Sequence, residues 1–204
     1  DGRPVEGQVR RLKKVSVRLT AAALILAAVI LTAALAGPAL SGFALRWLYP
    51  RHFTEVVSRE AEEFGLEEEL VYAVIRAESG FDQQASSRAQ AKGLMQLTEP
   101  TFQWMAEEYP PENGGGDVFD VNDNVHCGCA LLRLLLDHYG SLPVALAAYN
   151  AGMGNVDRWL GDAGLSPDGK RLAEIPFPET AAYVEKVQKL RGVYRQLYGE
   201  EQHR

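Results

Sequence analysis

Cysteine is nearly absent from this chain of 204 residues, which contains only Cys127 and Cys129. Residues two apart on a helix point in different directions, so a disulfide between them would strain the backbone. Together with His126 they also supply too few spaced ligands for a zinc site. We therefore predict two small buried residues without a disulfide, and the sequence predicts neither a metal nor a cofactor.

Sustained alternation of apolar and polar residues, the pattern of a half-buried strand, is also missing. Apolar residues instead recur at helical spacing, and Gly or Pro separates the successive runs. The helices expected from this pattern cover about residues 52–64, 70–79, 98–109, 122–139 and 179–198, and another is expected to be capped by Ser141. The predicted fold class is therefore mainly α, with at most a very small sheet.

Positive charge is scarce beyond the first eighteen residues. The formal net charge is −6, although six basic residues stand near the start: Arg3, Arg10, Arg11, Lys13, Lys14 and Arg18. The rest of the chain is markedly acidic, which excludes nucleic acid as a partner. We expect a solvated helix face and a helix N-terminus from the acidic cluster Glu60, Glu62, Glu63, Glu67, Glu68 and Glu69.

Charge of either sign is missing between Leu19 and Ala36. A helix of this length reaches roughly 27 Å, close to the hydrocarbon thickness of a bilayer. Weakly polar residues extend the segment to Leu45. The sequence thus predicts a transmembrane anchor at residues 19–45.

The basic residues on one side of this anchor set its expected orientation. Residues 1–18 should form a cytoplasmic tail, because loops rich in Lys and Arg stay in the cytoplasm. A folded domain at residues 46–204 would then lie outside the cell membrane, attached by a single pass. The alternative is a signal peptide cleaved near Ala34-Leu35-Ala36, which would place a secreted domain on the same side.

Glu78 is a lone carboxylate at the end of an apolar helical run. Helical spacing places it on the same stripe as Val71 and Ile75, so the helix should be nearly surrounded by other parts of the chain. Burial disfavours the charged carboxylate and raises its pKa, which keeps a Glu protonated near neutral pH and able to act as a general acid. The alternative is a surface acid paired with Arg76 or Arg88.

Short motifs follow Glu78 in a fixed order. They are Glu78-Ser79, then Ser87, then Gly93-Leu94-Met95-Gln96, Ala148-Tyr149-Asn150, and a closing run with Ile175, Pro176, Phe177, Glu179, Thr180, Tyr183 and Val184. From about Tyr49 to Tyr198, this order resembles the lysozyme-like catalytic domain of lytic transglycosylases of the soluble lytic murein transglycosylase type.

The resemblance implies a lysozyme-like helical domain with an active-site cleft, here preceded by the predicted transmembrane helix. It implies that Glu78 is the catalytic acid. Tyr149 is expected to hold the carboxyl group of this acid by a hydrogen bond. Short polar groups are expected to orient a sugar N-acetyl group or the acid itself. The substrate-binding residues that the resemblance implies are Ser79, Ser87, Met95, Gln96, Tyr149 and Asn150.

Glu78 is also the only carboxylate that the sequence predicts to be catalytic. Asp82 follows a helix-breaking glycine and Glu99 stands at a helix start, so each is expected to cap a segment or to be solvated. Enzymes that hydrolyse glycosidic bonds usually need two carboxylates. A single acid favours a reaction that consumes no water.

The resemblance implies such a reaction on peptidoglycan glycan strands. Glu78 would protonate the oxygen between N-acetylmuramic acid and N-acetylglucosamine, then act as a base on the 6-hydroxyl group, which gives a 1,6-anhydro product. The alternatives are a muramidase similar to goose-type lysozyme, which releases a reducing sugar, and a non-catalytic cell-wall-binding module. The sequence does not identify protein partners, which stay unknown.

Overall fold

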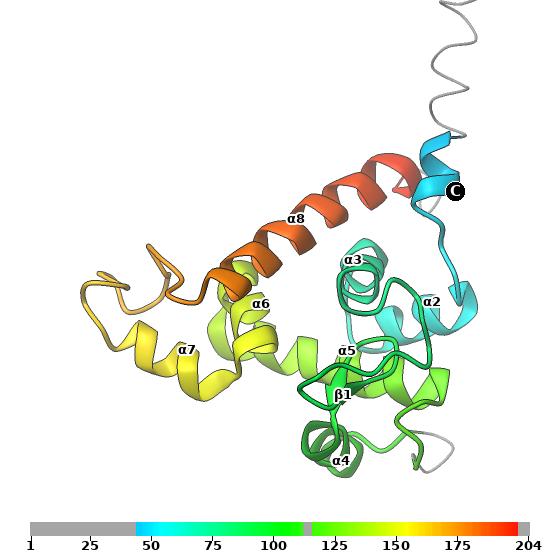
Figure 1. Cartoon of the computed structure of the whole chain (residues 1–204), viewed down its shortest axis with the longest axis horizontal. Coiled ribbons are helices and arrows are strands. Elements are labelled where there is room, and N and C mark those ends of the chain that lie inside the picture. Colours follow the sequence, from blue (N-terminus) through cyan, green and yellow to red (C-terminus); the bar gives the residue numbers. More distant parts are fainter. Residues whose placement is uncertain (1–43, 112–115, 200–204) are drawn as a thin grey trace, which may run out of the picture. The chain divides into compact units, whose positions relative to one another are not determined.

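The computed structural model describes residues 44–111 and 116–199 (Figure 1). The chain divides into two units, Asp1–Pro50 and Arg51–Arg204. In the first unit, residues 44–48 are helical. The predicted cytoplasmic tail at 1–18 and nearly all of the predicted anchor at 19–45 lie outside the described residues. Within the described ranges, no helix has the length and apolar character needed to cross a membrane.

The second unit is built from helices and one minimal sheet. The helices are α2 (Thr54–Glu63), α3 (Glu68–Glu78), α4 (Glu99–Glu108), α5 (Val121–Tyr139), α6 (Leu142–Ala151), α7 (Met153–Leu160) and α8 (Pro178–Tyr198). The strands β1 (Ala91–Lys92) and β2 (Leu97–Thr98) pair antiparallel, with Ala91 opposite Thr98. The predicted mainly α fold class with a very small sheet is confirmed.

One helix and one helix cap differ from the predictions. Helix α7 was not expected, because it has only eight residues and stands between glycines. Ser141 occupies the N-cap position of α6 as predicted, but its side chain makes no capping hydrogen bond. Side-chain capping occurs instead at α5, where Asp120 accepts hydrogen bonds from the backbone N–H groups of Asn122 and Asp123.

The core lies where α3, α5 and α6 meet their neighbours. Helix α3 packs against α2 and α8, while α5 packs against α2, α4 and α6 (Figure 1). From Leu70 to Ile75, every α3 side chain is at most 4% exposed. Both cysteines of α5 are free and fully buried, which confirms the prediction of two small buried residues.

The acidic cluster is only partly solvated, contrary to the prediction. Glu60 is 3% exposed and Glu69 is 6% exposed. For Glu60 the reason is a pair of partners, Arg59 beside it on α2 and His126 on α5. A charge can be buried when an opposite charge and hydrogen bonds replace its hydration.

Candidate active site

Glu78 is the last residue of α3, at the end of the buried helical run. Its side chain is half-buried, whereas Val71 and Ile75 on the same stripe are fully buried. Burial raises the pKa of Glu78 from its ordinary value of 4.5 to about 7, while Tyr183 and Lys186 act in the opposite direction. Near neutral pH the carboxyl group therefore exists in both protonation states, as a group that first donates and then accepts a proton requires.

Helix α8 supplies the two groups that lower this pKa. The phenol of Tyr183 is 8% exposed, and its hydroxyl group has no well-formed hydrogen bond within the described residues, although it faces Glu78 closely enough to favour the ionised form. The ammonium group of Lys186 donates a hydrogen bond of 2.7 Å to the carbonyl oxygen of Ala77. The sequence analysis did not predict that Tyr183 or Lys186 would act on Glu78. Their spacing of three residues, which places both side chains on one face of α8, could have indicated it.

The loop that carries Gln96 is held by hydrogen bonds from the Gln96 side chain to backbone carbonyl groups. The Gln96 side-chain amide donates to the carbonyl oxygens of Ala85 at 3.1 Å and Gly93 at 2.9 Å. Gln96 itself has a φ of 50°, in the left-handed region. Such a conformation is unfavourable for a side-chain-bearing residue and persists only where surrounding contacts enforce it. The amide nitrogen of Gln96 is therefore used to shape the loop.

Met95 anchors the same loop in the core. Its side chain is fully buried against Gly128 of α5, where an added Cβ would collide with the Met95 side chain. The sequence placed Met95 among the substrate-binding residues, but in this structure the side chain has no exposed surface. Its backbone carbonyl oxygen faces the site and accepts a hydrogen bond of 2.8 Å from Tyr149.

Asn124 is a residue of this region that sequence reasoning missed. It is fully buried in the first turn of α5. Its side-chain oxygen accepts from the backbone N–H of Met95 at 2.8 Å, and its amide donates to the carbonyl oxygens of Lys92 at 3.1 Å and Val118 at 2.8 Å. One amide thus fixes the loop before Gln96. The position of Asn124, a polar residue directly before the apolar run of α5, could have indicated this role.

Tyr149 and Asn150 tie α6 to the rest of the site. Tyr149 was expected to hold the carboxyl group of Glu78, but its hydroxyl donates instead to the carbonyl oxygen of Met95. Burial, followed by the nearby Glu78 charge, raises the pKa of Tyr149 well above its ordinary value. The Asn150 side-chain oxygen accepts a hydrogen bond of 2.8 Å from Thr180 in the first turn of α8.

The two predicted serine sites both shape the loop that follows α3. Ser79 donates to the carbonyl oxygen of Ile75 at 3.3 Å and accepts from the backbone N–H of Phe81 at 3.1 Å. Ser87 is exposed, and its hydroxyl oxygen accepts from the backbone N–H of Ala91 at 3.1 Å. A contact of either residue with substrate stays a prediction.

The other two candidate acids are engaged elsewhere, as predicted. Asp82 is exposed and accepts from the backbone N–H of Gln84 at 2.9 Å, closing a turn. Glu99 is exposed and pairs with Lys92 at 2.9 Å, and this bond lowers the pKa of the Glu99 carboxyl. Each of these two carboxylates therefore has a structural or solvated role, whereas burial raises the pKa of Glu78 into the range suited to proton transfer.

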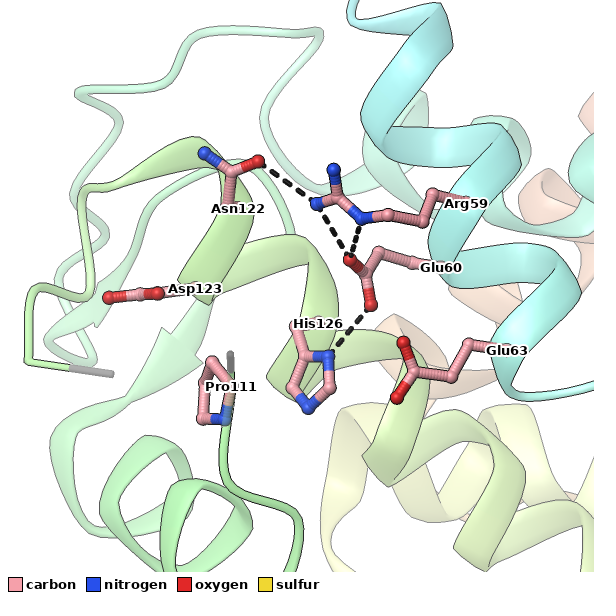
Figure 2. A pocket seen from close by; sticks show the side chains of 7 residues that line it. All are labelled: Arg59, Glu60, Glu63, Pro111, Asn122, Asp123 and His126. Carbon is pink, nitrogen blue, oxygen red and sulfur yellow. Dashed lines mark hydrogen bonds and ion pairs between the residues drawn. The ribbon is translucent and has the colours of Figure 1, made fainter. Parts of the chain in front are cut away.

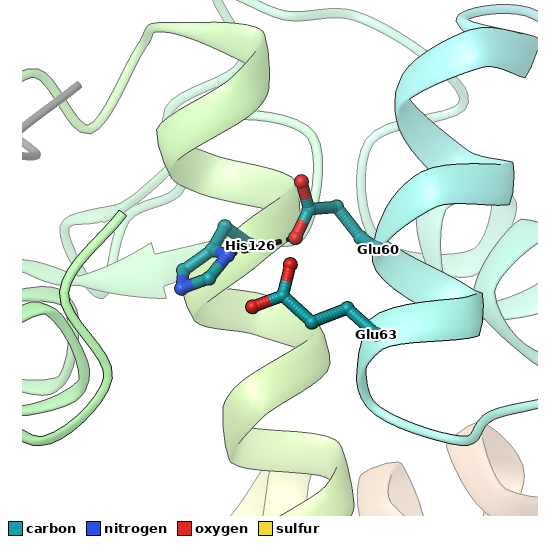
Figure 3. A group of neighbouring side chains, drawn as sticks. All are labelled: Glu60, Glu63 and His126. Atoms are coloured by element: carbon teal, nitrogen blue, oxygen red, sulfur yellow. Dashed lines mark hydrogen bonds and ion pairs between the residues drawn. The ribbon is translucent and has the colours of Figure 1, made fainter. Parts of the chain in front are cut away.

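A second polar group lies away from Glu78, between α2 and α5. Figure 2 shows the pocket there, lined by Arg59, Glu60, Glu63, Pro111, Asn122, Asp123 and His126. The possible ligand atoms of Glu60, Glu63 and His126 lie within 4.8 Å of one another (Figure 3). This spacing makes the group a candidate cation site.

The hydrogen bonds of His126 favour a proton over a metal ion. Its Nδ1 atom is 2.7 Å from a Glu60 oxygen, and its Nε2 atom is 3.1 Å from the carbonyl oxygen of Tyr109. Burial alone would lower the pKa of His126, but the bond to Glu60 outweighs it and the pKa is raised. Burial likewise opposes ionised Glu60, whose pKa is nevertheless lowered by His126 and Arg59. We interpret the group as an ion pair that joins α2 to α5.

The chain is similar in sequence to known proteins. The family model described as "Transglycosylase SLT domain" matches residues 55–170. The soluble lytic murein transglycosylase of Salmonella typhimurium is 28% identical over 158 residues, which cover 76% of this chain and 24% of that protein. The membrane-bound lytic murein transglycosylase C of Serratia proteamaculans is 31% identical over 119 residues, covering 52% of this chain and 33% of that protein.

The fold is similar to that of a solved structure as well. An inactive variant of the lytic transglycosylase Slt from Pseudomonas aeruginosa superposes with a TM-score of 0.64 at 30% sequence identity, over 74% of this chain and 25% of that one. The chain thus spans about a quarter of the length of the soluble relatives it matches.

Proposed function

Because the chain belongs to the transglycosylase SLT domain family, we propose that it is a peptidoglycan lytic transglycosylase. The proposed reaction is cleavage of the β-1,4 bond between N-acetylmuramic acid and N-acetylglucosamine. The observation that carries the proposal is the half-buried Glu78 carboxyl group, whose pKa is raised to about 7 by burial at the end of α3.

The chemistry begins with the protonated form of Glu78. Its O–H donates a proton to the glycosidic oxygen, and the electron pair of the breaking C1–O bond goes to that oxygen, which leaves as the hydroxyl group of N-acetylglucosamine. The N-acetyl group of the muramic acid stabilises the positive charge on C1. Glu78 is now a carboxylate, and the substrate carries the next proton to be moved.

Glu78 then serves as the base. It removes the proton of the 6-hydroxyl group, and that oxygen attacks C1 to form the 1,6-anhydro ring. One proton is given and one is recovered, so the acid is regenerated and no water enters the product. A pKa close to the working pH serves both halves, because neither form of the carboxyl group is then scarce.

The lack of a second carboxylate beside Glu78 supports this route over hydrolysis. Within the described residues, the side chains that alter the pKa of Glu78 are Tyr183 and Lys186, and neither is a carboxylate. Asp82 and Glu99 are held in a turn and a surface ion pair. A hydrolase would need a carboxylate that activates water.

We assign the substrate contacts to the polar groups of the motifs that follow Glu78 in the sequence. Ser79, Ser87 and Asn150 keep hydroxyl or amide groups for the sugar in addition to their contacts within the chain. The amide oxygen of Gln96 faces away from the two bonds that its nitrogen makes, and it would accept from a sugar N–H or O–H. The loop fixed by Met95 and Tyr149 holds these groups in place.

The mass of the products tests the reaction. Purified peptidoglycan is digested with the full chain, and the released muropeptides are weighed. The proposal predicts anhydro ends, which are lighter than reducing ends by one water. Products with only reducing ends would support the muramidase alternative and refute the lyase reaction, and binding without any cleavage would support a wall-binding module.

Substitution of the acid tests its role. Glu78→Gln keeps the size of the side chain and removes the proton, so cleavage should fall by roughly 10²-fold to 10⁴-fold while sedimentation with peptidoglycan persists. Glu99→Gln is the matched control, since this exposed acid pairs with Lys92 outside the proposed mechanism. Comparable activity of the two variants would end the assignment of Glu78.

We further propose that residues 19–45 anchor the domain to the cell membrane. The uncharged run from Leu19 to Ala36 and the basic residues before it support a single pass with a cytoplasmic N-terminus. A relative with a membrane-bound name is consistent with this arrangement. Fractionation of cells that express the full chain tests it, because a cleaved form would appear in the soluble fraction at a smaller mass.

A further inference from the structure

Lys186 is the cation that the fold brings to the end of α3. Helix α8 makes the most extensive helix–helix contact of the described chain with α3 (Figure 1). From the third turn of α8, the Lys186 ammonium group reaches the carbonyl oxygen of Ala77 at 2.7 Å. Ala77 directly precedes Glu78, so the bond fixes a positive charge next to the acid.

A purely structural explanation for this bond exists. The last carbonyl groups of a helix lack partners within the helix, and the C-terminal end carries partial negative charge. A lysine that binds one of these carbonyls therefore stabilises the helix end regardless of any reaction. The structural role alone predicts a loss of stability when Lys186 is replaced, without a change in the chemistry of Glu78.

The position of Lys186 relative to Glu78 adds a second effect. The charge on Lys186 favours the carboxylate form of Glu78. Two further titratable groups influence the same carboxyl group or are influenced by it, the phenols of Tyr183 on α8 and Tyr149 on α6. Both phenols are neutral near pH 7, since burial raises their pKa values. Lys186 is therefore the charged group in this set.

We propose that Lys186 is a positioning residue for the proposed transglycosylase reaction, which holds the last turn of α3 and keeps a positive charge beside Glu78 so that both forms of the acid are available. Burial alone would make Glu78 a weaker acid, because it disfavours the carboxylate that forms when the proton passes to the glycosidic oxygen. The nearby ammonium group stabilises this carboxylate and so favours donation of the proton. The carboxylate that results is then in place as the base for the 6-hydroxyl group. The inference rests on the proposed function.

Three variants separate charge from helix capping. Lys186→Met removes both the charge and the hydrogen bond, Lys186→Gln removes the charge and keeps a donor, and Lys186→Arg keeps both. Lys189→Met is the matched control, because Lys189 lies one turn further along α8 and pairs with Glu185. Circular dichroism and thermal melting establish that each full-length variant is folded.

The first measurement is a titration of Glu78 that needs no turnover. Carbon-13 NMR follows the side-chain carboxyl carbons of labelled Glu, and Glu78→Gln identifies the signal. In Lys186→Met and Lys186→Gln, the pKa of Glu78 should rise by roughly 0.5 to 1 pH unit, whereas Lys186→Arg and Lys189→Met should match the wild type. Salt at about 1 M should also raise the pKa of Glu78 in the wild type, because it screens the charge of Lys186 when the Debye length falls to about 3 Å.

The second measurement is the pH dependence of kcat/KM on peptidoglycan. The protonated acid is needed in the free enzyme, so activity falls as pH rises through the pKa of Glu78. This alkaline limb should move to higher pH in Lys186→Met by the same amount as the NMR titration. Lys186→Met and Lys186→Gln should also lower kcat more than they change KM, because the weaker acid donates its proton less readily after the substrate has bound.

The outcomes distinguish the two proposals. If the wild type releases anhydro products but the titration of Lys186→Met superposes on that of the wild type, Lys186 is only a helix cap and this inference is refuted. Should Lys186→Met not fold, the comparison of Lys186→Gln with Lys186→Arg decides in the same way. A wild type that yields only reducing ends overturns the proposed function, whereas the NMR result still reports on the coupling between Lys186 and Glu78.

Discussion

The elevated pKa of Glu78 predicts that the proposed catalytic acid reduces the stability of the fold at high pH. Glu78 binds its proton more tightly in the folded chain than in the unfolded chain, where its ordinary pKa is 4.5. Folding is therefore unaffected by ionisation below pH 4.5, and it is opposed increasingly as pH rises toward 7. Replacement by the neutral Gln removes this penalty.

The size of the effect follows from the two pKa values. A rise from 4.5 to about 7, at about 1.36 kcal/mol per unit, corresponds to a penalty on the order of 3 kcal/mol. The advantage of Glu78→Gln over the wild type should grow from pH 4.5 to 7 and stay constant above that. Among single substitutions, a gain of this size is unusual, because most substitutions destabilise a protein.

Denaturant unfolding followed by Trp fluorescence measures this difference, in steps from pH 4.5 to pH 9, with linear extrapolation of the free energy of unfolding. Glu99→Gln is the control, because an exposed acid with a lowered pKa has no such penalty to relieve. A difference between Glu78→Gln and the wild type that is independent of pH would refute the reasoning, since it would mean that Glu78 titrates alike in both states.

Three further predictions concern the residues that support the site. Asn124→Ala removes three buried hydrogen bonds and should lower the free energy of unfolding by roughly 3 kcal/mol, with a parallel loss of activity. Gly128→Ala should overpack the core and cost roughly 1 to 3 kcal/mol, whereas Gly192→Ala in open space should be neutral or stabilising in the same thermal melts. The third prediction concerns the Glu60–His126 ion pair. The pKa of Glu60 is lowered, so Glu60 stabilises the fold above its unfolded pKa and this contribution is lost as pH falls. The pKa of His126 is raised, so His126 stabilises the fold below its unfolded pKa and this contribution is lost as pH rises. Glu60→Gln should therefore destabilise most between about pH 4.5 and 6.5, and a deficit that grows steadily outside this window would contradict the ion pair.

The helices could be predicted from the sequence because each has a strong apolar period and clear ends. Gly140 shows why: it ends α5 with a φ of 61°, which glycine adopts without strain. The buried run before Glu78 was likewise evident from spacing alone. Helix α7 was missed because eight residues give too few apolar positions to establish a period.

The partners of the site residues could not be predicted in the same way. Which acceptor the Tyr149 hydroxyl reaches depends on the path of the loop around Met95, and that path depends on Asn124, far away in sequence. Burial of Glu60 likewise depends on His126 in another helix. Spacing within a helix fixes which residues share a face, but long-range pairing is decided by tertiary packing.

The two buried thiols determine how this domain responds to oxidants and reductants. Burial raises the pKa of Cys127 to about 12 and that of Cys129 well above its ordinary value, so almost no thiolate exists at neutral pH. Thiolate is the form that attacks a disulfide, and neither sulfur is open to a reagent. The domain should consequently mature equally well in a reducing cytosol and in an oxidising envelope, without help from enzymes that install disulfides.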